Sequence, residues 1–151
     1  MVSVMHPYPH HYTVLATGTP TGVTELSADG VPPLQAAAPP QFDGPDGLWS
    51  PEMLLSAAVA DCFVLSFRAL ARARGLAWRR LSCSVEGQLE RLEGQSRFTR
   101  FALLAKLAID SAADRPRAQA LLEQAEHGCL VANSLRAERV LRTEISCDAG
   151  A

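Results

Sequence analysis

The longest apolar segment of the chain predicts a central helix. Residues 53–67 carry a single charged side chain, Asp61. The Ser-Pro-Glu sequence at residues 50–52 is typical of a helix start, with Ser as the N-cap, Pro in the first turn and an acid near the positive end of the dipole. Gly75 predicts the helix end. Because a helix that is apolar nearly all round is buried on most sides, we expect this one at the centre of a domain or of a dimer.

Alternating polar and apolar positions predict a β-hairpin after this helix. Between Leu81 and Arg91 the apolar residues recur every second position, and the same period returns from Phe98 to Ile109. A turn at residues 93–95 (Glu-Gly-Gln) joins the two segments.

Before the helix, three shorter patterns predict a small meander of strands, at residues 12–17, 23–27 and 31–37. An Asp-Gly pair at residues 29–30 predicts a hairpin between the last two, and the prolines at 32–33 weaken the third strand.

After the hairpin, a second helix is predicted at residues 115–127 and ends at Gly128, followed by a short turn at 130–135 and a last strand at 140–147. This order predicts an α+β fold. We expect one domain over residues 12–148, preceded by an N-terminal extension at residues 1–11.

Composition narrows the class of protein. The 151 residues are 48% hydrophobic and 20% charged, as in an ordinary globular domain, and the net charge of −2 gives no overall attraction to nucleic acid. The N-terminus has no signal-peptide pattern, and charges interrupt the apolar segment before it reaches the length of a membrane span, so we expect a cytosolic protein with no membrane partner.

Charge is distributed unevenly along the chain. Residues 1–67 contain six acidic residues and no Lys or Arg, whereas all 14 basic residues lie from Arg68 onward, against ten acids. Compositional drift explains this asymmetry, or the positive half of one copy meets the negative half of a second.

The four cysteines are widely spaced and include no Cys-x-x-Cys pair, which disfavours a secreted disulfide framework or a zinc site. Cys83 and Cys147 lie in phase with apolar strand residues and are interpreted as small core residues. Position alone leaves two interpretations open for Cys62, within the apolar helix, and for Cys129, just after the second helix: inert packing, or a redox pair.

Two motifs carry a family resemblance. The run from Ser50 to Phe63, with a Pro-Glu pair and then Cys-Phe on a helix of small residues, resembles the central-helix motif of the osmotically inducible protein C / organic hydroperoxide resistance (OsmC/Ohr) family. The run from Glu126 to Leu135 resembles the family's second motif, a Cys at a helix end followed by a short polar turn. The resemblance covers about residues 12–147.

This resemblance implies a thiol-dependent peroxidase for organic hydroperoxides. Cys62 would be the peroxidatic cysteine, Cys129 the resolving cysteine that forms a disulfide with it, and Glu52 an auxiliary acid of the site. The family needs no metal or organic cofactor; an external dithiol, often a lipoyl group, reduces the disulfide. The implied assembly is an intertwined homodimer with the long helices at its centre. A dimer without peroxidase activity that binds a small molecule or senses redox state is the alternative.

The chain departs from the family pattern in one respect. Family peroxidases place an Arg from the N-terminal strands beside the reactive cysteine, and here no Arg or Lys precedes Arg68. The candidates to replace it are the following residues: His10, His11, Arg68, Arg136 and Arg142. For the two histidines, an exposed N-terminal position without function is the competing interpretation. His127 either modulates Cys129 or caps the helix.

Overall fold

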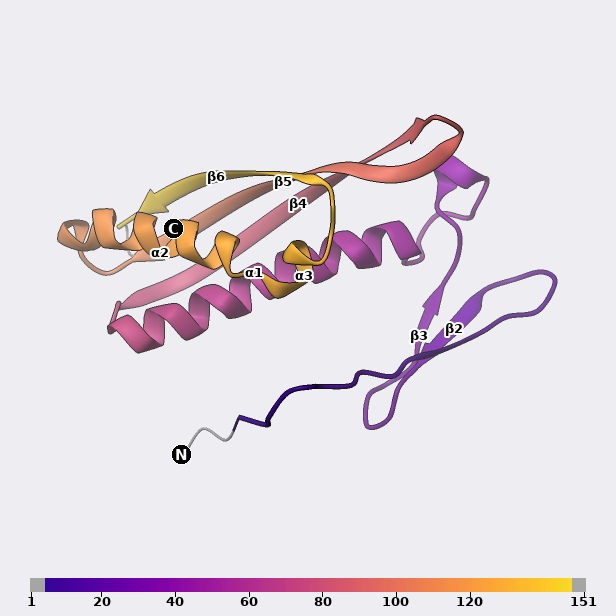
Figure 1. Cartoon of the computed structure of the whole chain (residues 1–151), viewed down its shortest axis with the longest axis horizontal. Coiled ribbons are helices and arrows are strands. Elements are labelled where there is room, and N and C mark those ends of the chain that lie inside the picture. The colour runs from indigo at the N-terminus through magenta and orange to yellow at the C-terminus, as the bar shows by residue number, and fades with distance from the viewer. Residues whose placement is uncertain (1–4, 148–151) are drawn as a thin grey trace. The chain divides into compact units, whose positions relative to one another are not determined.

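The computed structural model describes residues 5–147. The chain divides into two compact units, one ending at Pro51 and the other beginning at Glu52 (Figure 1). The prediction of a single domain over residues 12–148 stays a prediction.

The first unit holds a three-stranded antiparallel sheet of β1 (Leu15–Thr17), β2 (Thr24–Ser27) and β3 (Leu34–Ala36). β3 is shorter than predicted because the prolines at 32–33 have no N–H to donate to a neighbouring strand. Beyond β3, the backbone N–H of Ala37 donates to the carbonyl of Trp49 at 2.9 Å. A short 3-10 helix, η1 (Pro40–Phe42), lies in the loop between them.

The second unit begins with the long helix α1 (Pro51–Arg74). Its C-terminus is closed by Gly75, whose positive φ of 68° suits glycine, and by a hydrogen bond of 3.0 Å from the N–H of Leu76 to the carbonyl of Ala71. One stripe of α1 is fully buried, formed by Val59, Phe63, Phe67 and Ala71.

A second sheet follows, with strands β4 (Trp78–Leu92), β5 (Gln95–Ile109) and β6 (Glu138–Ser146) side by side. β4 and β5 form an antiparallel hairpin. Both residues of its two-residue turn, Glu93 and Gly94, have positive φ, the conformation that matches the twist of the strands. β6 runs parallel to β5.

The parallel connection from β5 to β6 passes through η2 (Ala112–Asp114), α2 (Arg115–His127) and the four-residue α3 (Leu130–Asn133) (Figure 1). Apolar side chains of α1, of α2 and of one face of the sheet share one core, which includes Phe101, Leu122 and Cys129. Each large side chain buried in this way contributes about 1.5–3 kcal/mol to stability.

The predicted α+β class and order of elements are confirmed. By length and hydropathy, α1 is also a helix that could cross a membrane, which the charge-based expectation did not anticipate. One such helix is weak evidence for a span, because the core helix of a soluble protein meets the same criteria.

Gly87 of β4 marks a close approach between the sheet and α1. A Cβ at this position would lie 2.8 Å from the Oγ of Ser56 and 2.9 Å and 3.0 Å from the rings of Phe98 and Phe101. We expect Gly87→Ala to lower the free energy of unfolding by about 1–3 kcal/mol, because the packed rings must move.

Chemical denaturation measures this change. Ser84→Ala, on the exposed face of the same strand, is the control, and its effect should stay within about 0.5 kcal/mol. A Gly87→Ala variant as stable as the wild type would contradict the close packing of α1 on β4.

Candidate functional site

Cys62 lies at the edge of the buried stripe of α1. It follows the buried Val59 by three positions and directly precedes the buried Phe63, while its own side chain is half-buried. Helical spacing places Ala58 and Leu65 beside it on the same side of the helix. The Cys62 thiol therefore borders both the core and a largely apolar outer surface of α1.

Cys129 lies between α2 and α3. Gly128 ends α2, with its N–H donating to the carbonyl of Gln124 at 3.0 Å, and Cys129 then becomes the N-cap residue of α3. Its side chain is buried, and its Sγ lies 4.0 Å from the carbonyl oxygen of Val59 on α1. The helix-ending glycine and the short turn thus bring this sulfur against α1.

The Cys62 and Cys129 thiols lie near each other, and several groups act on the pKa of Cys129. Burial raises the pKa of Cys129 above its ordinary value, the backbone amides of Ala132 and Val131 lower it, and a hydrogen bond with the Cys62 thiol and the charge of that thiol raise it further. Burial is the largest of these effects, and the net shift of the pKa is upward. Cys129 is therefore mostly a neutral thiol at neutral pH.

A third thiol lies close by, on β4. Burial, and then the charge of Cys129, raise the pKa of Cys83 to about 11. The half-buried Cys83 packs against the core as the strand pattern predicted, and its raised pKa keeps it protonated and unreactive at neutral pH. The sequence pattern did not indicate that it lies near Cys129.

Glu52 stands apart from the two cysteines along α1. Ten residues separate it from Cys62, which corresponds to about 15 Å along the helix axis. Within residues 5–147, its Oε1 atom is buried without a hydrogen-bond partner. A buried carboxylate oxygen without a donor is costly, so this atom is a candidate polar contact point of the site.

The candidate cations from α1 and β6 point away from Cys62. Arg68 is exposed, six residues along α1 and not on the same side of the helix as Cys62. On β6, Thr143 hydrogen-bonds to Gln119 of α2 at 2.7 Å, so its neighbour Arg142 projects from the opposite face of the sheet.

Arg136 lines a pocket of about 270 Å³ together with Arg97, Leu55 and apolar neighbours, and Cys62 is not among the residues that line it. His10 contacts its own segment, with hydrogen bonds to Tyr12 at 3.1 Å and to the carbonyl of His6 at 2.9 Å, and His11 is exposed.

His127 bonds through Nδ1 to the carbonyl of Glu123 at 3.0 Å, which supports the capping interpretation.

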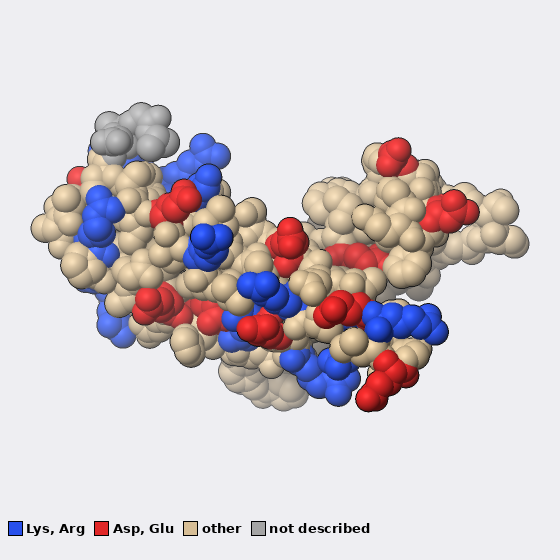
Figure 2. Space-filling view, turned by 90° about the horizontal axis from the view of Figure 1, so that it is seen from above, with Lys and Arg blue, Asp and Glu red and all other residues tan. Residues whose placement is uncertain are grey.

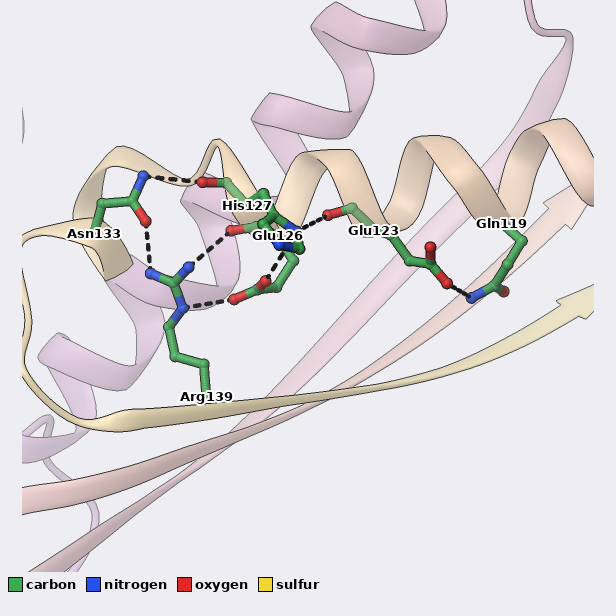
Figure 3. A network of polar contacts seen from close by, with 6 residues as sticks. All are labelled: Gln119, Glu123, Glu126, His127, Asn133 and Arg139. Carbon is green, nitrogen blue, oxygen red and sulfur yellow. Dashed lines mark hydrogen bonds and ion pairs between the residues drawn. The ribbon is translucent and has the colours of Figure 1, made fainter.

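The sequence pattern did not indicate the other polar residues around the Cys129 turn. Arg139 of β6 reaches Glu126 and Asn133 on either side of Cys129 (Figure 3). One signal was present in the sequence: Arg139 shares its strand face with Leu141 and Ile145, where a charged residue is unexpected.

Comparison with known proteins identifies the fold. A search of curated protein sequences gives no significant match. Among solved structures, an OsmC-like protein of unknown function from Vibrio cholerae is similar with a TM-score of 0.82 at 17% identity, over 90% of this chain and 100% of that chain.

Two organic hydroperoxide resistance proteins are similar as well. The protein from Elizabethkingia anophelis has a TM-score of 0.75 at 20% identity, and the one from Legionella pneumophila has 0.70 at 24% identity. Each comparison covers 93% of this chain and 99% of the other. At these identities the likeness shows the fold.

The sequence profile of the family described as OsmC-like protein matches residues 44–144, which include Glu52 and both candidate cysteines. This match covers well over half of the chain and agrees with the fold, and the chain therefore belongs to the OsmC-like protein family.

Proposed function

We propose that the protein is a thiol-dependent peroxidase that reduces organic hydroperoxides. The observation that supports this proposal is the nearness of the Cys62 and Cys129 thiols, which come from two elements 67 residues apart in the sequence and lie close enough for Cys62 to raise the pKa of Cys129. The similar folds of organic hydroperoxide resistance proteins support it. A cytosolic location agrees with it, because a thiol enzyme needs a compartment that keeps its cysteines reduced.

The first step takes place at Cys62. Its thiolate attacks the distal oxygen of the hydroperoxide, the O–O bond breaks, and the alcohol leaves after taking up a proton, so that Cys62 becomes a sulfenic acid. The half-buried position of Cys62 leaves its sulfur accessible, whereas Cys129 is buried. The apolar side chains of Ala58 and Leu65 beside it favour an alkyl hydroperoxide over hydrogen peroxide.

The second step takes place between the two cysteines. The Cys129 sulfur attacks the sulfur of the Cys62 sulfenic acid, and a disulfide forms. The hydroxyl group of the sulfenic acid leaves with one proton as water. An external dithiol, such as a lipoyl group, then reduces the disulfide by two exchange steps and is itself oxidised. No cofactor bound to the protein takes part in either step.

The proposed assembly is a homodimer built on α1. Outside its buried stripe, α1 exposes apolar side chains, with Leu65 47% exposed. The first 67 residues carry acids and no Lys or Arg, whereas charges of both signs mix over the visible surface of the second unit (Figure 2). A second copy with its helix antiparallel to α1 brings Glu52 near the partner's Cys62, where the unpaired Oε1 meets a donor.

One observation favours a second function. Residues 1–67 have no Arg or Lys to activate Cys62, and the pocket beside Leu55 combines Arg97 and Arg136 with aromatic rings. A protein of this kind binds a small anionic molecule with an apolar portion and does not reduce peroxides. The next experiment separates the two functions.

Titration of the reduced protein with cumene hydroperoxide tests the peroxidase. We expect one equivalent of peroxide to remove the free thiols of Cys62 and Cys129 together, because the sulfenic acid is captured by its neighbour. Thiol counting with a chromogenic disulfide measures the loss. Cys62→Ser should abolish the loss, whereas the control Cys147→Ser should leave it unchanged.

Unchanged thiols in the wild type at a modest excess of peroxide would exclude the peroxidase and favour the binding protein.

The rate of disulfide formation should depend on pH through Cys129. Its raised pKa leaves a small fraction of thiolate at neutral pH, and this fraction grows about tenfold for each pH unit below the pKa. We therefore expect resolution of the sulfenic acid to accelerate steadily from acidic to alkaline pH. Rapid quenching followed by sulfenic acid trapping measures the rate, and a rate that does not change with pH would contradict attack by Cys129.

The dimer is tested at Leu65. Leu65→Lys places an unpaired charge in the proposed apolar interface and should raise the dimer dissociation constant by about tenfold or more. Sedimentation velocity measures this constant. Ala120→Lys, on the exposed side of α2, is the matched control and should sediment as the wild type does. A wild-type protein that stays monomeric at micromolar concentration would refute the proposed assembly.

A further inference from the structure

The segment that carries Cys129 is short, and Cys129 and Ala132 are its buried core residues. It joins α2 to the four-residue α3 through Gly128, and the backbone N–H of Cys129 makes a long hydrogen bond of 3.3 Å to the carbonyl of Glu126. The carbonyl of Cys129 accepts from the N–H of Asn133 at 2.9 Å. A single turn of helix has little stability in isolation, so its position depends on the burial of Cys129 and Ala132 and on the polar groups around it.

Arg139 of β6 holds both ends of the segment. Its Nε lies 2.6 Å from the Oε1 of Glu126, as an ion pair whose N–H is not aligned as a hydrogen bond. Its Nη1 donates to the Oδ1 of Asn133 at 2.8 Å, and its Nη2 to the backbone carbonyl of Glu126 at 3.4 Å. The guanidinium therefore contacts the residue three positions before Cys129 and the residue four positions after it.

Asn133 links Arg139 to the end of α2, which closes a ring of contacts made by Arg139, Glu126, His127 and Asn133. Its side-chain N–H donates to the backbone carbonyl of His127 at 3.0 Å, so the end of α2 and the end of α3 are linked through one amide and one guanidinium. Figure 3 shows the Arg139 side chain rising from β6 toward the end of α2, with Asn133 on its other side. The planar guanidinium makes these contacts at once, which an ammonium group cannot do.

The base of the Arg139 side chain is itself fixed. Arg139 is paired in register with Phe101 of β5, which is fully buried, and the Arg139 and Glu126 side chains are only 19% and 14% exposed. Solvent therefore screens the ion pair little. The contacts of Arg139 with Glu126 and Asn133 therefore link the Cys129 segment to the sheet. The helix α1, which carries Cys62, packs on the same sheet.

We propose that Arg139 is a positioning residue for the Cys62–Cys129 redox pair, acting by holding the Cys129 turn against α1. A disulfide requires its two Cβ atoms within about 3.5–4.5 Å, so a small displacement of the turn lowers the effective concentration of one thiol at the other. This inference rests on the proposed function in one respect: it assumes that Cys62 and Cys129 form a disulfide.

The test measures that disulfide without peroxide. The protein is equilibrated in buffers of reduced and oxidised glutathione, and the fraction of Cys62–Cys129 disulfide gives the effective concentration of the pair. We expect Arg139→Gln to lower it by about tenfold or more, and Arg139→Lys to lie between Arg139→Gln and the wild type. Arg142→Gln, three residues along the same strand on the opposite face, should match the wild type.

A second readout separates positioning from stability. With cumene hydroperoxide, Arg139→Gln should form the Cys62 sulfenic acid at the wild-type rate but convert it to the disulfide about tenfold more slowly, so that trapped sulfenic acid accumulates. If Arg139→Gln does not fold, the exposed Asn133→Ala, which removes one link of the ring, should show the same selective slowing to a smaller extent.

Each outcome is decisive. An effective concentration that is unchanged in Arg139→Gln overturns the role of Arg139 even if the variant is less stable. A wild type that forms the disulfide with glutathione but ignores peroxide refutes the peroxidase and leaves the measurement on Arg139 valid. A wild type that forms no Cys62–Cys129 disulfide in any glutathione buffer refutes both.

Discussion

The packing of α1 on one face of the second sheet is the constraint on which the candidate site depends. Val59, Phe63 and Phe67 fix the rotation of the helix, because their side chains are fully buried against the sheet and α2. Once this stripe is buried, Cys62 must lie at its edge, half-exposed, and the carbonyl of Val59 must face Cys129. The rotation of one helix thus decides which thiol meets solvent and which meets the core.

The roles proposed for the two cysteines rest on this difference in burial. In the proposed reaction the peroxide must reach the first sulfur, and Cys62 is half-exposed, whereas Cys129 is buried. Burial raises the pKa of Cys129, which keeps its thiol neutral at neutral pH; in the proposed reaction this protects it from direct oxidation before the Cys62 sulfenic acid forms. Arg139, fixed on β6, then has a purpose in this account, since a buried neutral thiol reacts at a useful rate only when it is held in place.

Much of this arrangement was predictable from the sequence, for identifiable reasons. The charge-free run in α1, the Gly75 and Gly128 helix ends and the alternation in β4 and β5 are local signals, and the structure confirms the elements that they predict. The third strand is shorter than the alternating pattern predicts because the prolines at 32–33 have no N–H for a sheet hydrogen bond. The two cysteine motifs predict a site from residues far apart in the chain because the family resemblance links them, and the structure brings their thiols near each other.

Other features depend on tertiary contacts that no local pattern records. The nearness of Cys83 to Cys129 arises from the placement of β4 beside α1, and the contacts of Arg139 with Glu126 and Asn133 arise from the parallel return of β6 beside β5. The unpaired oxygen of Glu52 is also visible only in the structure. The roles of Glu52 and of the dimer remain proposals.

Peptide mapping by mass spectrometry, after exposure of the reduced protein to one equivalent of an organic hydroperoxide, tests the central claim most directly. If Cys62 and Cys129 are a redox pair, the disulfide-linked peptide contains these two residues, and Cys83 and Cys147 are recovered as free thiols. A disulfide between any other two cysteines, or a chain with four free thiols and intact peroxide, would contradict the account.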